Sequence, residues 1–304
     1  MTTTTTATLV SRIGRRLSAV PAGGVRAITL RSIWRTPRAL LGLALTLLVI
    51  AVATLGAFWT PHDPTTFNAG PAFTAPGFAY PMGTDVYGRD ILSRVMAGAG
   101  VSLTVSVAAV AGALVIGTVF GVAAGYFGGI ADAVLTRAID ILLAIPGLVM
   151  ALGIVTLLGP SAQSVTVALI AVYSWQFARI VRSSVVSARS RPYVEASRGV
   201  GSSAFGIIGR DIFPNLLPVL IVQVTTAFAW GILDEASIGF LGLGVQPPDP
   251  SWGSLLIEGR EFMYEAPWLG VGAGAVVVVA VLGVNLLGDG LRDIVDPRSG
   301  GVNS

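Results

Sequence analysis

Lysine and cysteine are both absent from this chain of 304 residues, and histidine occurs only once, as His62. Without lysine, the phosphate-binding motif G-x4-G-K-[ST] cannot be built, so we do not expect the chain itself to hydrolyse ATP. Without cysteine, disulfides and thiolate metal sites are excluded. A single histidine beside Pro61 also excludes paired-histidine zinc sites and offers no suitable base for a Ser-His-Asp triad. The sequence therefore predicts a protein that is not an enzyme, with no metal site.

Charge is scarce as well. Only 12% of the residues are charged, 53% are hydrophobic and the mean hydropathy is +0.78, whereas soluble domains carry about 25% charged residues. All 19 cationic side chains are arginines, and they are dispersed at the edges of apolar runs. The pI near 9.7 is therefore explained by membrane topology, and we expect no nucleic-acid partner. The composition predicts an all-α integral membrane protein in contact with the lipid bilayer.

Six apolar runs are long enough to cross a bilayer, whose hydrocarbon core requires about 20 helical residues. The predicted spans are about 39–59, 101–125, 139–158, 164–186, 216–241 and 268–288. The third run contains Pro146 and Gly147, which a spanning helix tolerates when its neighbours satisfy the freed backbone groups. The predicted transmembrane domain is 39–290, between an N-terminal tail of 1–38 and a C-terminal tail of 291–304.

Arginines indicate the orientation of these spans. The segment before the first span carries seven arginines and no acidic residue, so we expect it to be a cytoplasmic tail and not a cleaved signal peptide. Six crossings then place the insert 187–215, with its four arginines, and the C-terminal tail on the same side. Arg179 and Arg182 mark the inner end of the fourth span. Five crossings would put the basic insert or the basic tail on the wrong face.

Small residues dominate the second span, where glycines recur in the pattern Gly117-x3-Gly121-x3-Gly125. Such a stripe lets helix backbones approach closely in lipid. It could also line a pathway, although packing is the favoured interpretation.

The insert contains the first of three motifs, YVEASRGVGSSAFGIIGRDIFPN at 193–215. Glu195 near the start of a predicted helix favours the positive end of its dipole. Gly201 permits a turn, and Pro214 disrupts the helix where the chain re-enters the membrane. With Ala196 and Ser197, the segment resembles E-A-A-x3-G-x9-I-x-L-P, the cytoplasmic EAA signature of ABC importer permeases. Serine replaces the second alanine of that signature here.

The second motif, YPMGTDVYGRDILSR at 80–94, precedes the second span. It is similar to H-P-L-G-T-D-x-x-G-R-D-x-x-S-R of dipeptide, oligopeptide and nickel permeases. We expect it to anchor an external segment at the membrane edge, with turns at its glycines and a pair between Asp90 and Arg94 across one helical turn. A binding role for its charges is the alternative. The residues carried over from the family motif are Gly83, Thr84, Asp85, Gly88, Arg89 and Asp90.

The third motif, DEASIGFLGLGVQPPDPSWG at 234–253, begins in the outer half of the fifth span and continues beyond it. It is similar to E-A-x-L-S-F-L-G-L-G-x-Q-P-P-x-P-S-W-G of the C-type partner of those permeases. Its matching residues are Glu235, Phe240, Gly242 and Gly244. Carboxylates at this depth are costly in lipid, so Asp234 and Glu235 should face protein or water.

Together the three motifs resemble the binding-protein-dependent transport permeases, in the C-type branch for dipeptides, oligopeptides and nickel. The resemblance implies a type I ABC importer permease fold with six transmembrane helices, both termini in the cytoplasm, and a location in a bacterial cytoplasmic membrane. The insert, through Glu195, Ala196, Ser197, Gly201 and Pro214, would dock on an ATP-hydrolysing subunit.

The implied partners are a second related permease, two ABC ATPase subunits that use ATP, and an extracytoplasmic solute-binding protein; this chain would bind no cofactor itself. The expected cargo is a short peptide. Nickel or another small solute is an alternative, and a proton-coupled carrier using Asp234 and Glu235 is an alternative of a different class. The sequence assigns no substrate-binding residues.

Overall fold

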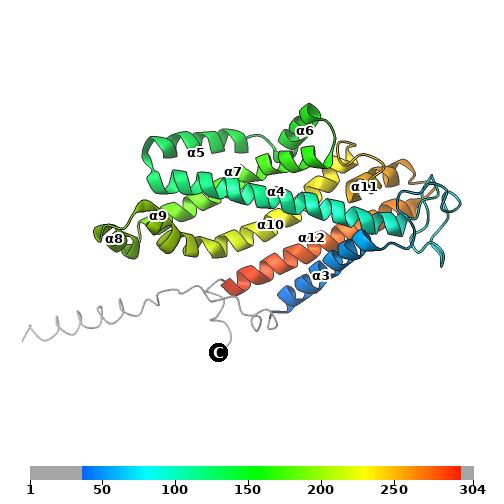
Figure 1. The fold of residues 1–304 in the computed structure, drawn as a ribbon, viewed down its shortest axis with the longest axis horizontal. Helices are drawn as coiled ribbons and strands as arrows, with labels where there is room; N and C mark the ends of the chain where they lie inside the picture. Colours follow the sequence, from blue (N-terminus) through cyan, green and yellow to red (C-terminus); the bar gives the residue numbers. More distant parts are fainter. Residues whose placement is uncertain (1–35, 296–304) are drawn as a thin grey trace, which may run out of the picture.

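A computed structural model of the chain describes residues 36–295 (Figure 1). Within that range every regular element is helical. Of the predicted tails, residues 1–35 and 296–304 lie outside the described residues, and residues 291–295 continue the last helix. The helices are α3 (Pro37–Phe58), α4 (Ile91–Phe127), α5 (Gly129–Leu143), α6 (Gly147–Leu158), α7 (Ala162–Arg189), α8 (Pro192–Gly199), α9 (Ala204–Ile207), the π-helical turn η1 (Ile208–Ile212), α10 (Phe213–Phe240), α11 (Trp252–Glu261) and α12 (Pro267–Val295).

Five helical stretches are long and apolar enough to cross a membrane, and the bent pair α5–α6 makes a sixth if it counts as one span. The third predicted span therefore differs from the structure. In place of a continuous run at 139–158, α5 begins at Gly129 and the chain turns by 87° before α6. Pro146 explains the break, because it has no N–H for the helix ladder and disfavours helical geometry at the residue before it.

α4 is also longer than the span predicted at 101–125. It begins at Ile91, where the Asp90 carboxylate accepts a hydrogen bond from the Ser93 backbone N–H at 3.0 Å. This is the N-cap arrangement that favours a helix start. The first turns of α4 contain Ser93 and Arg94, which interrupt the apolar run, and most of their residues are buried within the protein, so hydropathy alone does not reveal them.

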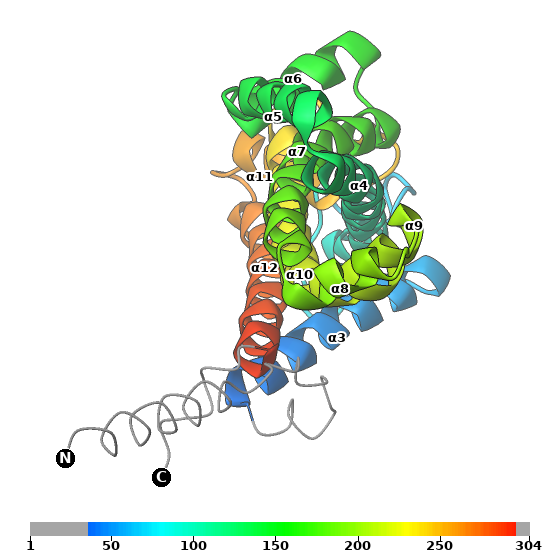
Figure 2. The ribbon, with the colours of Figure 1, turned by 90° about the vertical axis from the view of Figure 1, so that its left-hand side faces the viewer.

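The long helices lie along one bundle, in which α4 and α7 run in the same direction (Figures 1 and 2). α3 and α12 are antiparallel neighbours, since Gly42 backs onto Leu287 and Gly283 onto Leu45. One end of the bundle, the α8 end, holds the start of α3, the insert α8–η1 and the end of α12. The other, the α11 end, holds α11 and the segment 59–90. Both ends of the described chain thus lie at the α8 end; the side of the membrane on which that end lies stays a prediction.

The core is centred on the contact between α4 and α7. A Cβ atom added at Gly121 would lie 2.6 Å from Val181 Cβ, and one at Gly125 would lie 2.8 Å from Val185 Cβ. Gly117 fits against Phe177 in the same way. These three α7 side chains are completely or almost completely buried. The packing interpretation of the glycine stripe is confirmed.

We predict that Gly121→Ala lowers the stability of the folded chain. The added methyl group would overlap Val181 and the carbonyl oxygen of Ala178, and overpacking costs about 1–3 kcal/mol. Gly153→Ala in α6 is the matched control, because a Cβ there meets nothing within 4 Å. The midpoints of thermal unfolding in detergent should be lower for Gly121→Ala alone; equal midpoints would contradict the prediction.

Candidate functional site

The insert between α7 and α10 forms a short folded unit at the α8 end. α8 begins at Pro192, and Val194 anchors it because its side chain is completely buried. After α8 the chain reverses at Gly201, whose φ of +81° lies in the left-handed region that glycine tolerates best. The Gly201 N–H donates to the Arg198 carbonyl oxygen at 2.9 Å, which closes the turn. Sequence reasoning placed a turn at this glycine.

The chain then returns to the membrane helices through α9 and η1. The Ser203 hydroxyl caps α9 by accepting from the Gly206 N–H at 3.2 Å. Ile207 and Ile212 are buried, so two further anchors join the insert to the core. Pro214 has no N–H to donate at the start of α10, and the helix is locally widened into a π turn just before it.

Two arginines connect the insert to the end of α4. The Arg189 guanidinium donates to the carbonyl oxygens of Gly125 and Tyr126, at 3.0 and 3.2 Å. These carbonyls belong to the last turn of α4, where a helix lacks internal partners. The Arg198 guanidinium lies over the Tyr126 ring, 5.4 Å from its centroid. These contacts tie the insert to the end of α4.

The outward side of this unit combines apolar and polar groups. Val200 and Phe205 are each 83% exposed, and Tyr193 is also exposed. Glu195 and Ala196 are exposed beside them, whereas Ser197 is half-buried. Exposed apolar side chains on a rigid, well-anchored unit are typical of a surface that contacts another protein. We call Tyr193, Glu195, Val200 and Phe205 the insert surface.

At the α11 end, the second motif folds into two tight turns. Gly83 and Gly88 have φ values of +77° and +69°, as expected for turn glycines. The Thr84 hydroxyl, completely buried, donates to the Pro71 carbonyl at 2.6 Å and accepts from the Thr74 N–H at 2.8 Å. The motif therefore organises the segment 59–90.

The charges of this motif form a buried cluster. The Asp85 carboxylate accepts from Arg89 Nε at 2.6 Å and from Arg94 Nη1 at 2.7 Å. Arg94 also donates to the Glu258 carboxylate of α11 through its two terminal nitrogens, Nη1 and Nη2, at 2.5 and 2.7 Å. Two carboxylates and two guanidinium groups balance, which satisfies the requirement that buried charges be paired. We call Asp85, Arg89, Arg94 and Glu258 the charge cluster.

The pair expected between Asp90 and Arg94 is wrong. The Asp90 carboxylate caps the N-terminus of α4, and its Oδ2 lies 3.5 Å from His62 Nδ1. Arg94 instead forms ion pairs with Asp85 and Glu258. Sequence reasoning missed Glu258 because it lies 164 residues from Arg94 and no local spacing connects the two. Of the two interpretations of the motif, anchoring fits this geometry.

The third motif folds α11 back against α10. A Cβ added at Gly253 would lie 2.7 Å from Gly239 Cα, so only glycine allows this approach. Gly244 also contacts Gly239, Gly242 turns the chain with a φ of +82°, and the Arg260 guanidinium lies 5.0 Å from the Phe240 ring centroid.

Both carboxylates of the third motif face protein, as predicted. Asp234 accepts a hydrogen bond from the Tyr173 hydroxyl at 2.6 Å. Glu235 is 1% exposed; Ser102 and Ser251 are its polar neighbours, but neither meets the distance and angle of a hydrogen bond with it. The Glu235 side chain lies where α4, α10 and α11 meet. At this junction the Trp252 backbone N–H of α11 donates a hydrogen bond to Ser102 Oγ of α4 at 3.1 Å.

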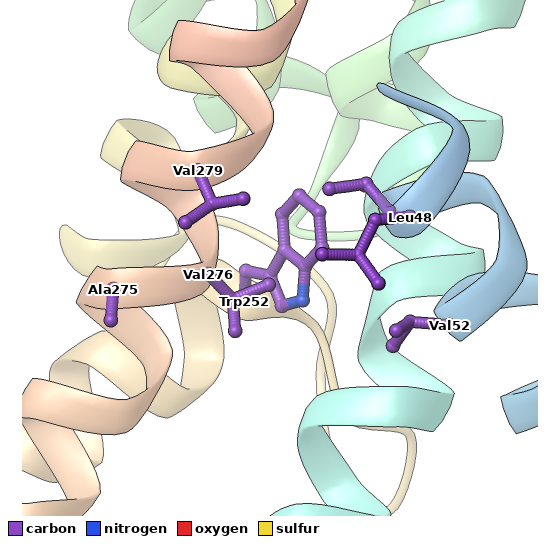
Figure 3. A pocket seen from close by; sticks show the side chains of 7 residues that line it. Leu48, Val52, Trp252, Ala275, Val276 and Val279 are labelled. Carbon is purple, nitrogen blue, oxygen red and sulfur yellow. The ribbon is translucent and has the colours of Figure 1, made fainter. Parts of the chain in front are cut away.

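A hollow of about 200 Å³ lies between α3, α11 and α12, with the Trp252 indole at its base (Figure 3). Its lining is apolar throughout, with Leu48, Val52 and Val276 among the residues around it. A polar solute would find no hydrogen-bonding group there. Among residues 36–295, no cluster of three or more histidine, aspartate or glutamate side chains could hold a metal ion.

Long apolar helices, a folded insert at one end and a charge-anchored segment at the other define an all-helical, multi-pass membrane protein. Residues 117–300 match the family described as binding-protein-dependent transport system inner membrane component. The chain is 40% identical over 260 residues to the dipeptide transport system permease protein of Alkalihalophilus pseudofirmus, covering 86% of each chain. It therefore belongs to this family, and the predicted localisation in a bacterial cytoplasmic membrane is confirmed.

Other relatives carry related names. The dipeptide transport system permease protein of Haemophilus influenzae is 38% identical over 266 residues, covering 86% of this chain and 90% of that one. The glutathione transport system permease protein of Pectobacterium atrosepticum is 37% identical over 254 residues, covering 83% and 84%. An inward-facing structure of the MetNI methionine ABC transporter matches 67% of this chain and 97% of its own chain, with a TM-score of 0.55 and 19% identity; this likeness concerns the fold.

We predict that Glu258→Gln destabilises the α11 end. The substitution leaves Arg94 almost fully buried with one carboxylate partner fewer, and breaking a buried ion pair costs about 3 kcal/mol. Glu261→Gln makes the same chemical change at an exposed position of the same helix. Thermal unfolding in detergent should separate the two variants, and limited proteolysis should cut the segment 59–90 faster only in Glu258→Gln. Indistinguishable behaviour would contradict the structural role of the charge cluster.

Proposed function

We propose that this chain is one of two permease subunits of an ABC importer for short peptides, and that ATP is hydrolysed by two separate ATPase subunits. The observation that carries the proposal is the insert surface, an exposed patch on a unit with three buried anchors at the α8 end. The names of the relatives as dipeptide permeases support the cargo. Likeness in fold to an ABC transporter subunit supports the energy source.

The insert is suited to receive mechanical work from a partner. Val194, Ile207 and Ile212 belong to the same core cluster as α4 and α7, so a push on α8 is transmitted to packed helices and not absorbed by a loose loop. Such rigid-body movement of helices is a common form of two-state switching. ATP binding in the partner would move the α8 end, and the packed helices would follow.

The remaining partners follow from the same assignment. A second, related permease would complete the pathway, and an extracytoplasmic solute-binding protein would deliver cargo at the α11 end, where the charge cluster keeps the segment 59–90 folded. This chain would bind no cofactor of its own. In this arrangement Glu195, Ala196 and Gly201 act in docking, and none of them takes part in covalent chemistry.

We predict that Glu195→Arg weakens association with the ATPase subunits. Reversing an exposed charge within an interface reduces complementarity, and we expect at least a tenfold loss of affinity, or about 1.4 kcal/mol. Glu265→Arg makes the same change at an exposed position of the α11 end. Co-purification with the ATPases measures the difference. Equal yields of ATPase with both variants would contradict the docking role.

We further predict that the assembled transporter takes up a radiolabelled dipeptide in an ATP-dependent manner when its binding protein is supplied. Nickel uptake by the same vesicles serves as the comparison, and a pH gradient without ATP tests the proton-coupled alternative. Dipeptide accumulation only with ATP supports the proposal. Accumulation of nickel alone would change the cargo, and uptake driven by the pH gradient alone would overturn the ABC assignment.

A further inference from the structure

Five helical stretches are long and apolar enough to cross a membrane, and α7 has the lowest mean hydropathy of the five. Part of the reason lies in its second half, where Gln176, Arg179, Ser183 and Ser187 follow one another at spacings of three or four residues. In an α-helix this spacing places side chains on one face. We call these four residues the polar stripe. The opposite face, which includes Phe177, Val181 and Val185, packs against α4.

The polar stripe is not covered by the rest of this chain. Arg179, Ser183 and Ser187 are exposed, and Gln176 is half-buried. Arg179 forms an ion pair with Asp140 of α5 at 2.7 Å, although the two side chains are 57% and 50% exposed. Charges and amides facing hydrocarbon are costly, and such groups inside membrane proteins face protein or a water-filled cavity. Hydrocarbon is therefore a costly neighbour for the Arg179–Asp140 pair and for Gln176.

The polar stripe leads to a pocket of about 350 Å³ between α7 and α10 at the α8 end. Ser183, Ser184 and Ser187 of α7 line one side, and Asn215 of α10 lines the other. Arg191 and the apolar residues Ala188, Leu216 and Val219 complete the lining, which contains no acidic residue. The hollow beneath α3 and α12, by contrast, is lined only by apolar side chains (Figure 3). Hydroxyl, amide and guanidinium groups can replace the hydrogen bonds that a polar solute makes with water.

We propose that the polar stripe of α7 and the pocket at its end line a water-filled route along which a hydrophilic solute with peptide-like hydrogen-bonding groups leaves toward the α8 end. The inference rests on the proposed function, because it assigns a segment of the pathway to named residues. The exposed ion pair and the polar pocket carry it together. A dry contact with the second permease is the competing occupant of the same face, and it is an outcome of the test.

The absence of cysteine makes a direct test possible, because any cysteine introduced is the only thiol in the chain. Gln176→Cys and Ser183→Cys place the new thiol on the polar stripe inside the predicted span 164–186, whereas Ser187 lies beyond it. Val278→Cys on α12 is the matched control, since Val278 is 62% exposed but lies on an apolar helix. The assembled transporter, in vesicles with the α8 end outward and without nucleotide, is treated with a charged, membrane-impermeant methanethiosulfonate. A thiol reacts as the thiolate, which forms in water and not in hydrocarbon.

We expect both stripe cysteines, Gln176→Cys and Ser183→Cys, to react at least about tenfold faster than Val278→Cys, since only they meet water. Labelling after denaturation in detergent must be complete for all three variants, which shows that each thiol is intact. ATP-dependent uptake by the two stripe variants shows that the complex is assembled. Rates as slow as that of Val278→Cys in an assembled complex would overturn the water-filled route and indicate a dry protein contact.

The readout also separates this inference from the proposed function. Labelling measures access of water and does not require transport. Fast labelling without peptide uptake would support the water-filled route and contradict the assignment of peptides as the cargo. Slow labelling with intact ATP-dependent uptake would support the importer function and contradict the route along α7.

Discussion

Between α4 and α7, three glycines replace the side chains that would otherwise hold two helices apart. Gly117, Gly121 and Gly125 let α7 side chains approach the α4 backbone. Helices in lipid gain little from hydrophobic burial against each other, so close packing supplies much of their association. α5 then attaches to α7 through Arg182 and Asp132, at 2.5 Å, and α7 continues toward the insert. The position of the insert surface therefore depends on this glycine contact.

The two ends of the bundle are built by different physical means. At the α11 end, buried charges connect the segment 59–90, α4 and α11, and each charge finds an opposite partner within the protein. Burying charges stabilises a structure only when the pairing is complete, so this end is specified by geometry. At the α8 end, apolar anchors hold the insert while its outer face stays free. One end is closed on itself, and the other presents a surface to a partner.

Several features were accessible from sequence because their cause is local. Gly83, Gly88 and Gly201 were predicted as turns, and all three adopt positive φ values that favour glycine. The glycine stripe was assigned to packing on its spacing alone. Pro146 was recognised, but hydropathy cannot state whether a proline is tolerated within a straight helix or turns the chain by 87°. Whether the chain bends at Pro146 depends on the helices against which α5 and α6 pack.

Other features were not accessible, because their partners lie far away in the chain. Arg179 and Arg182 were interpreted as markers of orientation, yet each is paired with an aspartate of α5. Arg94 was matched with the nearby Asp90, whereas the fold gives Asp90 to the helix cap and brings Glu258 to Arg94. Local spacing suggests ion-pair partners that are close in the sequence. Tertiary packing decides which charged side chains are close in space and buried together.

By itself, the amino-acid sequence determined the membrane class, the family and the location of the three motifs, since composition and residue order are enough to set hydropathy and motif spacing. Only the tertiary structure decided which charges neutralise one another, where the third span breaks, and which face of α7 stays polar and uncovered. The physical reason is that pairing and exposure are properties of surfaces brought together by packing, and residues distant in sequence contribute to each of them.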